Sequence, residues 1–235
     1  MSGVQATPAR RRPSTWLALG LFGLALGMVA FVYGALWLAD VERLSRPPED
    51  AELVTMLASI LVILTLPTVG AILAIQRPAN PIGWLLLVAG ISFGMSFFEP
   101  VYVDLSVELD ARLPGYRLLD WISPAMQTLG FVLIVVWLPL LFPDGRLPGP
   151  RWKAVVGVLA IALVIDLTLI LVTDQASHDR VAPPPVVLDG LLETAALGLR
   201  DVIGMVNGAF VLFAVAAVVV RFRRSHGIER QQMKW

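Results

Sequence analysis

Three polar residues inside long apolar runs are the side chains best placed to do chemistry in this chain. Asp166 is the one acid well inside such a run, and Gln127 and Asn207 lie at a similar depth in two other runs. Asp166 precedes Thr173 by seven residues, which on a helix is a depth of about 10 Å. A carboxylate in lipid costs several kcal/mol unless it is paired, hydrated or protonated. We therefore expect Asp166, Gln127 and Asn207 to form one hydrogen-bonded cluster inside a helix bundle.

Such a cluster has three candidate roles. It can hold helices together, it can respond to a proton or a ligand, or it can belong to a transport pathway. A neutral Asp166 would donate a hydrogen bond to one of the two amides, whereas its anion would need water or other donors. A pathway normally requires several polar residues in series, and the chain offers only one acid and two amides here.

Other chemistries have few residues to carry them. The chain contains no cysteine, which excludes disulfides, thiolate metal sites and cysteine nucleophiles. Its two histidines, His178 and His226, are far apart in sequence. No H-E-x-x-H motif and no phosphate-binding glycine loop is present. The sequence therefore predicts no metal site, no cofactor and no catalytic residue.

The elements that must position these residues are six apolar runs. The chain is 57% hydrophobic and 15% charged with a mean hydropathy of +0.77, whereas a soluble domain carries about 25% charged residues. A helix needs about 20 apolar residues to cross a bilayer. We predict an all-α, polytopic membrane bundle with helices at about 16–38, 53–75, 82–98, 119–142, 153–173 and 200–220.

The first run follows Arg10, Arg11 and Arg12 and so resembles a secretory signal peptide. Its apolar stretch of about 23 residues is, however, longer than the 7–15 of a signal peptide, and no A-x-A cleavage site follows. We interpret it as an uncleaved first span.

Charged residues orient the bundle. Segments 1–15, 76–81, 143–153 and 221–235 hold 12 of the 18 Lys and Arg residues, and only two acids. The remaining loops and helix ends hold six Arg and 15 of the 18 acids, with Asp120, Arg200 and Asp201 counted among them. By the positive-inside rule the first set is cytoplasmic. This predicts a cytoplasmic tail at 1–15, a six-span domain at 16–220 and a basic cytoplasmic linker at 221–235.

Loop composition adds finer expectations. Inner loops 76–81 and 143–152 are rich in Pro, Gly, Asn and Asp, which is typical of tight turns closing helical hairpins. Outer segment 99–118 alternates polar and apolar residues and predicts a short strand or an interfacial helix. Outer segment 174–199 ends in apolar residues at helical spacing, which predicts a short amphipathic helix on the outer surface. That helix would cap the bundle or form one wall of a ligand pocket.

Two pairs of glycines stand at G-x-x-x-G spacing, Gly23 with Gly27 and Gly90 with Gly94. Small residues at this spacing let helices approach closely. They are expected to pack helices within the chain or to form a homodimer contact.

Three segments carry a family resemblance. RPANPIGWLLL, LFPDGRLPGPRW and RFRRSHGIERQQMKW together resemble the N-terminal membrane region of bacterial sensor histidine kinases, mainly of actinobacteria. The similarity covers most of the chain from about residue 76, and all three segments fall on the predicted cytoplasmic side. The matching positions are Asn80, Pro81, Gly83, Trp84, Pro143, Asp144, Gly145, Arg146, Arg151, Trp152, Arg230, Gln231, Gln232, Lys234 and Trp235.

The resemblance implies a multi-span sensor, or input, module in the bacterial cytoplasmic membrane. In that family the membrane region precedes a dimerisation helix with a phosphorylated histidine and an ATP-binding domain. This chain ends inside the linker motif, and His226 lacks the H-D or H-E pair of a phosphoacceptor. The resemblance therefore predicts a fragment or split form without kinase activity of its own. Expected partners are the lipid bilayer, a second copy and a cytoplasmic kinase core encoded downstream, but no nucleic acid.

A small multi-pass transporter or channel is the alternative function. It predicts a row of polar residues along one or more helices and an inverted repeat. Neither is evident in the sequence. An intramembrane enzyme lacks the required nucleophile and base.

Overall fold

The computed structural model describes residues 13–39, 50–108, 113–147, 149, 152–173 and 188–224, and all of its regular elements in these ranges are helical. They are α1 (Pro13–Ala39), α2 (Asp50–Gln76), α3 (Pro81–Glu108), α4 (Tyr116–Val132), the π-helix η2 (Leu133–Trp137), α5 (Leu138–Leu141), α6 (Trp152–Val172) and α7 (Leu191–Arg224). The predicted all-α polytopic bundle is confirmed.

Five helical rods in the described ranges are long and apolar enough to cross a membrane. One of them, Tyr116–Leu141, is built from α4, η2 and α5 in continuous succession. In α2, which has 27 residues, the apolar part whose side chains are described is shorter, Ile63–Gln76. The chain is therefore a multi-pass membrane protein, and its sixth span stays a prediction.

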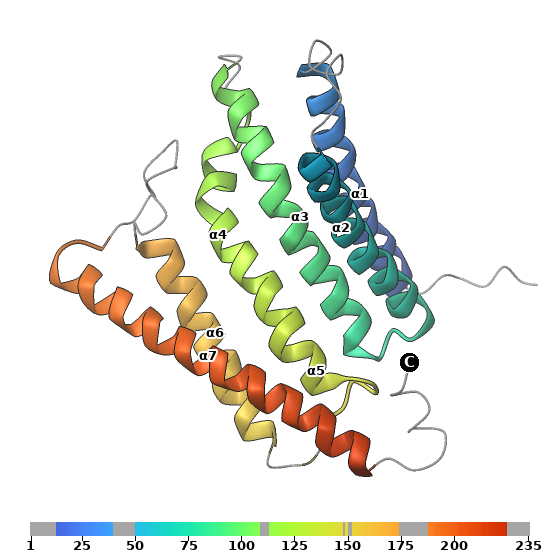
Figure 1. The fold of residues 1–235 in the computed structure, drawn as a ribbon, viewed down its shortest axis with the longest axis vertical. Helices are drawn as coiled ribbons and strands as arrows, with labels where there is room; N and C mark the ends of the chain where they lie inside the picture. The colour runs from blue at the N-terminus through green and yellow to red at the C-terminus, as the bar shows by residue number, and fades with distance from the viewer. Residues whose placement is uncertain are drawn as a thin grey trace, which may run out of the picture.

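The rods alternate in direction through the bundle (Figure 1). The starts of α1, α3 and α6 lie at the same end of the molecule as the ends of α5 and α7. That alternation is what the predicted topology requires. Which end faces the cytoplasm rests on the charge pattern alone, and we name the two ends inner and outer accordingly.

Helices α1, α2 and α3 form one half of the molecule, and glycines bring their backbones close together. A Cβ added at Gly83 would lie 2.5 Å from the Ala74 nitrogen, and one at Gly70 would lie 2.6 Å from the Leu87 nitrogen. A Cβ added at Gly90 would lie 2.6 Å from the Pro67 Cδ atom. Since no side chain fits at these points, α2 and α3 are in backbone contact along much of their length.

The two predicted glycine pairs behave differently. Gly90 packs tightly as expected, and Gly94 is in ordinary contact with Met28 and Ile63. Gly23 and Gly27 are exposed on α1, with nothing within 4 Å of an added Cβ. The α1 pair therefore does not pack helices within the described part of the chain, and its dimerisation alternative stays a prediction.

The second half consists of α4, η2, α5, α6 and α7. It is joined to the first half through α3, which packs against α4. Its core is made of apolar side chains and not of glycine contacts: Val132, Val136, Leu140, Leu159, Leu163 and Ala214. Helix α7 packs against α6, η2 and α5, and most of its side chains at 191–214 are exposed.

The predicted strand or interfacial helix in outer segment 99–118 is wrong. Helix α3 continues without interruption to Glu108 and contains Pro100 in its interior. Val103 and Ser106 are both buried at helical spacing, and the Tyr102 ring packs against Phe98 and Phe31. This packing against α1 stabilises the helix beyond the proline, whose missing N–H removes only one backbone hydrogen bond.

The predicted surface helix before the last span is also wrong as a separate element. Residues 191–200 and the last span form one continuous helix, α7, of 34 residues. No proline interrupts this stretch. Ala196, Ile203 and Ala214 are buried at intervals of seven and eleven residues, which keeps one face of a single straight helix toward the bundle.

Candidate functional site

Asp166 lies on the buried stripe of α6. Leu159, Leu163, Asp166 and Ile170 follow one another at spacings of three and four residues and are all buried. Asp166 is only 8% exposed. The expectation that this acid points into the bundle is confirmed.

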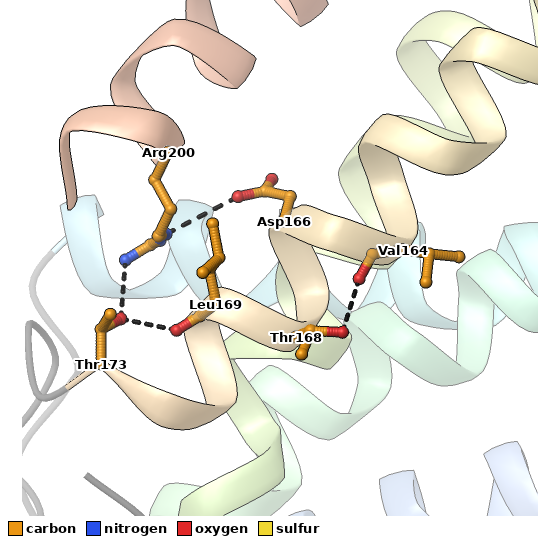
Figure 2. Close-up of polar contacts among 6 residues, drawn as sticks. All are labelled: Val164, Asp166, Thr168, Leu169, Thr173 and Arg200. Atoms are coloured by element: carbon orange, nitrogen blue, oxygen red, sulfur yellow. Dashed lines mark hydrogen bonds and ion pairs between the residues drawn. The ribbon is translucent and has the colours of Figure 1, made fainter. Parts of the chain in front are cut away.

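The partner of Asp166 is Arg200 on α7. The Arg200 Nε atom lies 3.6 Å from Asp166 Oδ1, and Arg200 Nη1 lies 3.5 Å from Thr173 Oγ1 (Figure 2). Thr173, which is 1% exposed, donates its hydroxyl hydrogen to the Leu169 carbonyl at 2.7 Å. We call Asp166, Thr173 and Arg200 the outer polar contact. It joins the outer ends of α6 and α7.

The predicted cluster with the two amides does not form among the described residues. Gln127 is exposed on α4, and no hydrogen bond joins it to Asp166. Asn207 is half-buried, and its Oδ1 atom has no hydrogen-bond partner in the described part of the chain. Equal depth on three helices does not fix the direction of each side chain around its helix axis, and this is why the prediction was wrong.

A sequence signal for Arg200 did exist. Ala196, Arg200, Ile203 and Asn207 follow one another at spacings of four, three and four residues, so they share one face of a helix. Treating Arg200 as a helix-end residue outside the span hid that pattern. Once α7 is continuous, the face that buries Ala196 and Ile203 brings Arg200 to α6.

The outer polar contact is suited to holding helices together. Its nitrogen–oxygen distance of 3.6 Å exceeds the 2.7–2.9 Å of a strong charge-assisted hydrogen bond. The two side chains are also partly exposed, 23% for Arg200 and 12% for Asp166. The pair is therefore partly solvated, and its energy is expected to lie below that of a fully buried, well-aligned pair.

The outer end of α4 contributes two further polar groups that the sequence analysis left aside. Trp121 donates its indole N–H to the Leu171 carbonyl at 2.8 Å, which fixes α4 to α6. Asp120 is buried, and its Oδ2 atom has no hydrogen-bond partner among the described residues. A buried acid at this position was not predicted, since Asp120 stands where the loop charges end.

At the inner end, the RPANPIGW segment forms a compact turn, as predicted. The Asn80 side chain accepts a hydrogen bond from the Ile82 N–H at 3.0 Å, which caps α3 with Pro81 at its first position. Trp84 donates its indole N–H to the Pro78 carbonyl at 3.0 Å. The residues that resemble the family motif thus serve to close the turn between α2 and α3.

The PDGR segment forms the second inner turn. The Gly145 N–H donates to the Leu141 carbonyl at 2.7 Å, and Gly145 has a φ of +70°. The peptide bond between Phe142 and Pro143 is cis. A positive φ is a conformation that glycine adopts far more readily than other residues, which explains the residue type at this position.

The two inner turns are in contact. A Cβ added at Gly145 would meet the Asn80 Oδ1 atom and would lie 2.5 Å from Pro81 Cδ. We call Asn80, Pro81 and Gly145 the inner turn junction. It connects the start of α3 with the end of α5, so two of the three segments that carry the family resemblance meet at one point.

The remaining motif residues are only partly described. Asp144 and Arg146 are exposed, and Pro143 and Trp152 are half-buried. Arg151 and the linker residues Arg230, Gln231, Gln232, Lys234 and Trp235 lie outside the described residues, as do His178 and His226.

A π-helical turn lies between the two candidate sites. In η2 the Leu138 N–H donates to the Leu133 carbonyl, one residue further back than in an α-helix. Pro139 follows at the start of α5 and has no N–H to offer to the preceding turn. The shift to π geometry accommodates this proline within a continuous rod. No sequence feature other than Pro139 pointed to it.

Comparison of the chain with protein-family models, with curated proteins and with solved structures found no match in any of the three.

Proposed function

We propose that the chain is the membrane-embedded input module of a two-component-type signalling protein in the bacterial cytoplasmic membrane. The observation that carries this proposal is the inner turn junction. Gly145 of the PDGR segment packs against Asn80 and Pro81 of the RPANPIGW segment. Residues that resemble a sensor-kinase motif thus contact one another at the predicted cytoplasmic end, where an effector domain would receive a signal.

The packing of α7 supports a role in transmission. Its outer part is attached to α6 through the Asp166–Arg200 pair. Further along, it packs against η2 and α5, and α5 leads directly into the Gly145 turn. A displacement of α7 at the outer end would therefore act on the element that holds the inner turn junction.

The proposal is tested by joining the whole chain at Trp235 to the dimerisation and catalytic core of a histidine kinase. Phosphate transfer to the cognate response regulator is then measured in membranes. Gly145→Ala should change this output several-fold at equal protein level, because the new methyl group pushes against Asn80 and Pro81. Gly149→Ala is the matched control in the same loop, since no atom of the described residues lies within 4 Å of its added Cβ.

Equal output from the parent, Gly145→Ala and Gly149→Ala proteins would contradict the proposal. A substrate or ion flux in proteoliposomes of the chain alone would favour the transporter or channel alternative. The DNA following codon 235 gives an independent result, since an open frame encoding a kinase core supports an input module.

A further inference from the structure

Two complementary polar atoms in the second half of the molecule are buried without hydrogen-bond partners among the residues that the structure describes. The indole nitrogen of Trp137 on η2 is one, and the Oδ1 atom of Asn207 on α7 is the other. An indole N–H only donates, and an amide oxygen only accepts. Helix α7 packs against η2, so the two groups belong to elements in contact. Each lacks what the other supplies.

The position of Trp137 depends on the π-helical turn. Trp137 is the last residue of η2. The N–H of the next residue, Leu138, donates to the Leu133 carbonyl, whereas in an α-helix it would donate to the carbonyl of the residue that follows Leu133. Successive residues of an α-helix are about 100° apart around the axis. A return of this turn to α geometry would therefore rotate Trp137 relative to the residues of α4. The direction of its indole group is coupled to the state of the turn.

The position of Asn207 depends on α7. Asn207 follows Arg200 by seven residues, two helical turns, and so lies on the same face of α7. The fully buried side chains of α7 among those described are few and mostly small, Ala196, Ile203 and Ala214. Phe210 and Val211 also pack against the core of the second half, but they are only half-buried. Partly buried and small side chains resist a sliding helix less than fully interlocked large ones do.

The polar contact between Arg200 and α6 is also long. Its Arg200–Asp166 distance is 3.6 Å and its Arg200–Thr173 distance is 3.5 Å. The same face of α7 thus carries the long polar contact of Arg200 at its outer end. Two turns further along it carries the Asn207 Oδ1 atom, which has no hydrogen-bond partner among the described residues. The unpaired donor lies on the element against which that helix packs.

We propose that α7 shifts against η2 between two arrangements with different polar contacts. In the arrangement of the structure, Arg200 is paired with Asp166, and the Trp137 indole N–H has no partner in the described part of the chain. In the second, Asn207 accepts a hydrogen bond from Trp137, and the Arg200–Asp166 contact is open. The α6–α7–η2 contact is thereby a two-state element.

This device rests on the proposed function for its purpose, because an input module needs a movable helix. Its test does not use a kinase and concerns the chain alone. A result that contradicts the two arrangements of α7 therefore does not contradict the signalling function. A result that contradicts the signalling function likewise does not contradict the two arrangements.

The test is nuclear magnetic resonance of the full chain in lipid nanodiscs, with ¹⁵N-labelled tryptophan. Trp84 and Trp121 are internal references, because their indole N–H groups are bonded to the Pro78 and Leu171 carbonyls. Trp137→Phe assigns the Trp137 signal. Arg200→Gln should move this signal downfield toward the references and slow its hydrogen exchange several-fold. Asn207→Leu in the Arg200→Gln background should reverse both changes.

Asp201→Asn is the matched control, since Asp201 is the next residue on α7 and is exposed. It should leave the Trp137 signal unchanged. Unmoved Trp84 and Trp121 signals report that a variant has folded, and Asp166→Asn opens the same contact if Arg200→Gln does not fold. The proposal is overturned if the Trp137 signal is the same in the parent, Arg200→Gln and Asp166→Asn proteins. A shift that persists with Asn207→Leu also overturns it, because the acceptor is then water or another group.

Discussion

The two halves of this bundle are packed by different means. Half of the residues are buried in an 18-residue apolar stretch of α3 within Pro81–Val107, whereas only 11% are buried in the corresponding stretch of α7 within Leu191–Ala214. Helix α3 lies between α2 and α4 and meets α2 through glycine, so backbone touches backbone. Helix α7 lies at the edge, and its contacts among the described residues include a few apolar side chains and the partly solvated contacts of Arg200 with Asp166 and Thr173.

This difference separates a scaffold from a movable part. Close backbone contact leaves no free volume for a helix to shift without losing many contacts at once. The second half instead holds the ion pair and the π-helical turn. It also holds three buried polar atoms without a hydrogen-bond partner among the described residues, on Asp120, Trp137 and Asn207, whereas the first half holds one, on Ser96. Such groups are costly where packing is dense, and most of them lie here where packing is sparse.

The largest expected effect is in the scaffold. Gly83→Val should lower the free energy of unfolding by about 3 kcal/mol, because overpacking cannot be relieved where the neighbours are backbone atoms. An added Cβ at Gly83 lies 2.5 Å from the Ala74 nitrogen and 2.9 Å from the Leu73 carbonyl carbon. Equilibrium unfolding of the purified chain in mixed micelles measures the change.

Gly208→Val on α7 is the control for that substitution. Nothing lies within 4 Å of its added Cβ, so the change should stay within about 0.5 kcal/mol. Equal losses for Gly83→Val and Gly208→Val would remove the proposed distinction between the two halves.

The second prediction is an asymmetry within the ion pair. Arg200→Gln should destabilise the chain by about 2 kcal/mol, because it leaves the buried Asp166 carboxylate without its cation. Asp166→Asn should cost only about 1 kcal/mol, because the long Arg200 side chain keeps Thr173 and can reach the outer surface.

A double-mutant cycle in the same unfolding assay separates the pair from its surroundings. The double variant should lose less stability than the sum of the two single variants. Additive losses, or a larger loss for Asp166→Asn than for Arg200→Gln, would show that the two charges do not stabilise each other.

Features that depend on neighbouring residues could be predicted from the sequence, and features that depend on distant contacts could not. Hydropathy located the helices, and composition located both inner turns, because these properties act locally along the chain. Asp166 was placed correctly in the interior since a membrane carboxylate has few other options. Its partner was missed because depth along a helix says nothing about direction around it. The sequence predicts a break before the last span because a charged residue such as Arg200 is typical of the end of a span, whereas α7 is continuous through it.

Other features depend on contacts that the sequence does not encode locally. The backbone approach at Gly70 and Gly83 requires the relative position of α2 and α3. The π-helical turn depends on which carbonyl each N–H reaches around Pro139. The inner turn junction brings Asn80 and Gly145 into contact, although they are 65 positions apart in the chain. No local sequence pattern predicts such a contact.

The third prediction concerns the inner turn junction, where the scaffold meets the second half. Gly145→Ala should destabilise the chain by about 2 kcal/mol. About 1 kcal/mol of this arises from a side chain at positive φ, and about 1 kcal/mol arises from contact with Asn80 and Pro81. Gly115→Ala isolates the first part, since Gly115 has a φ of +79° with nothing within 4 Å of an added Cβ.

Gly115→Ala should therefore cost about 1 kcal/mol in the same unfolding assay. The difference between the two variants measures the contact between the turns. If Gly145→Ala and Gly115→Ala lower the free energy of unfolding by the same amount, backbone conformation alone explains the glycine at position 145. The inner turn junction then contributes nothing to stability.

The smallest effect is expected on the outer surface of the scaffold, at Gly23 and Gly27 of α1. Both are exposed, and nothing lies within 4 Å of an added Cβ at either. Their replacement by Ile should change the unfolding free energy of the single chain by no more than about 0.5 kcal/mol. The informative measurement is association, by energy transfer between labelled copies in vesicles at increasing dilution in lipid.

If a second copy uses this pair of glycines, as their spacing allows, the Ile variants should weaken association while leaving unfolding unchanged. Gly90→Ile is the wrong control, because Gly90 lies against Pro67 inside the chain. Gly20→Ile is the matched one, since Gly20 is on the same helix, exposed and equally open, but outside the four-residue pair. If Gly23→Ile and Gly27→Ile leave association unchanged, this face of α1 contacts lipid and not a second copy of the chain.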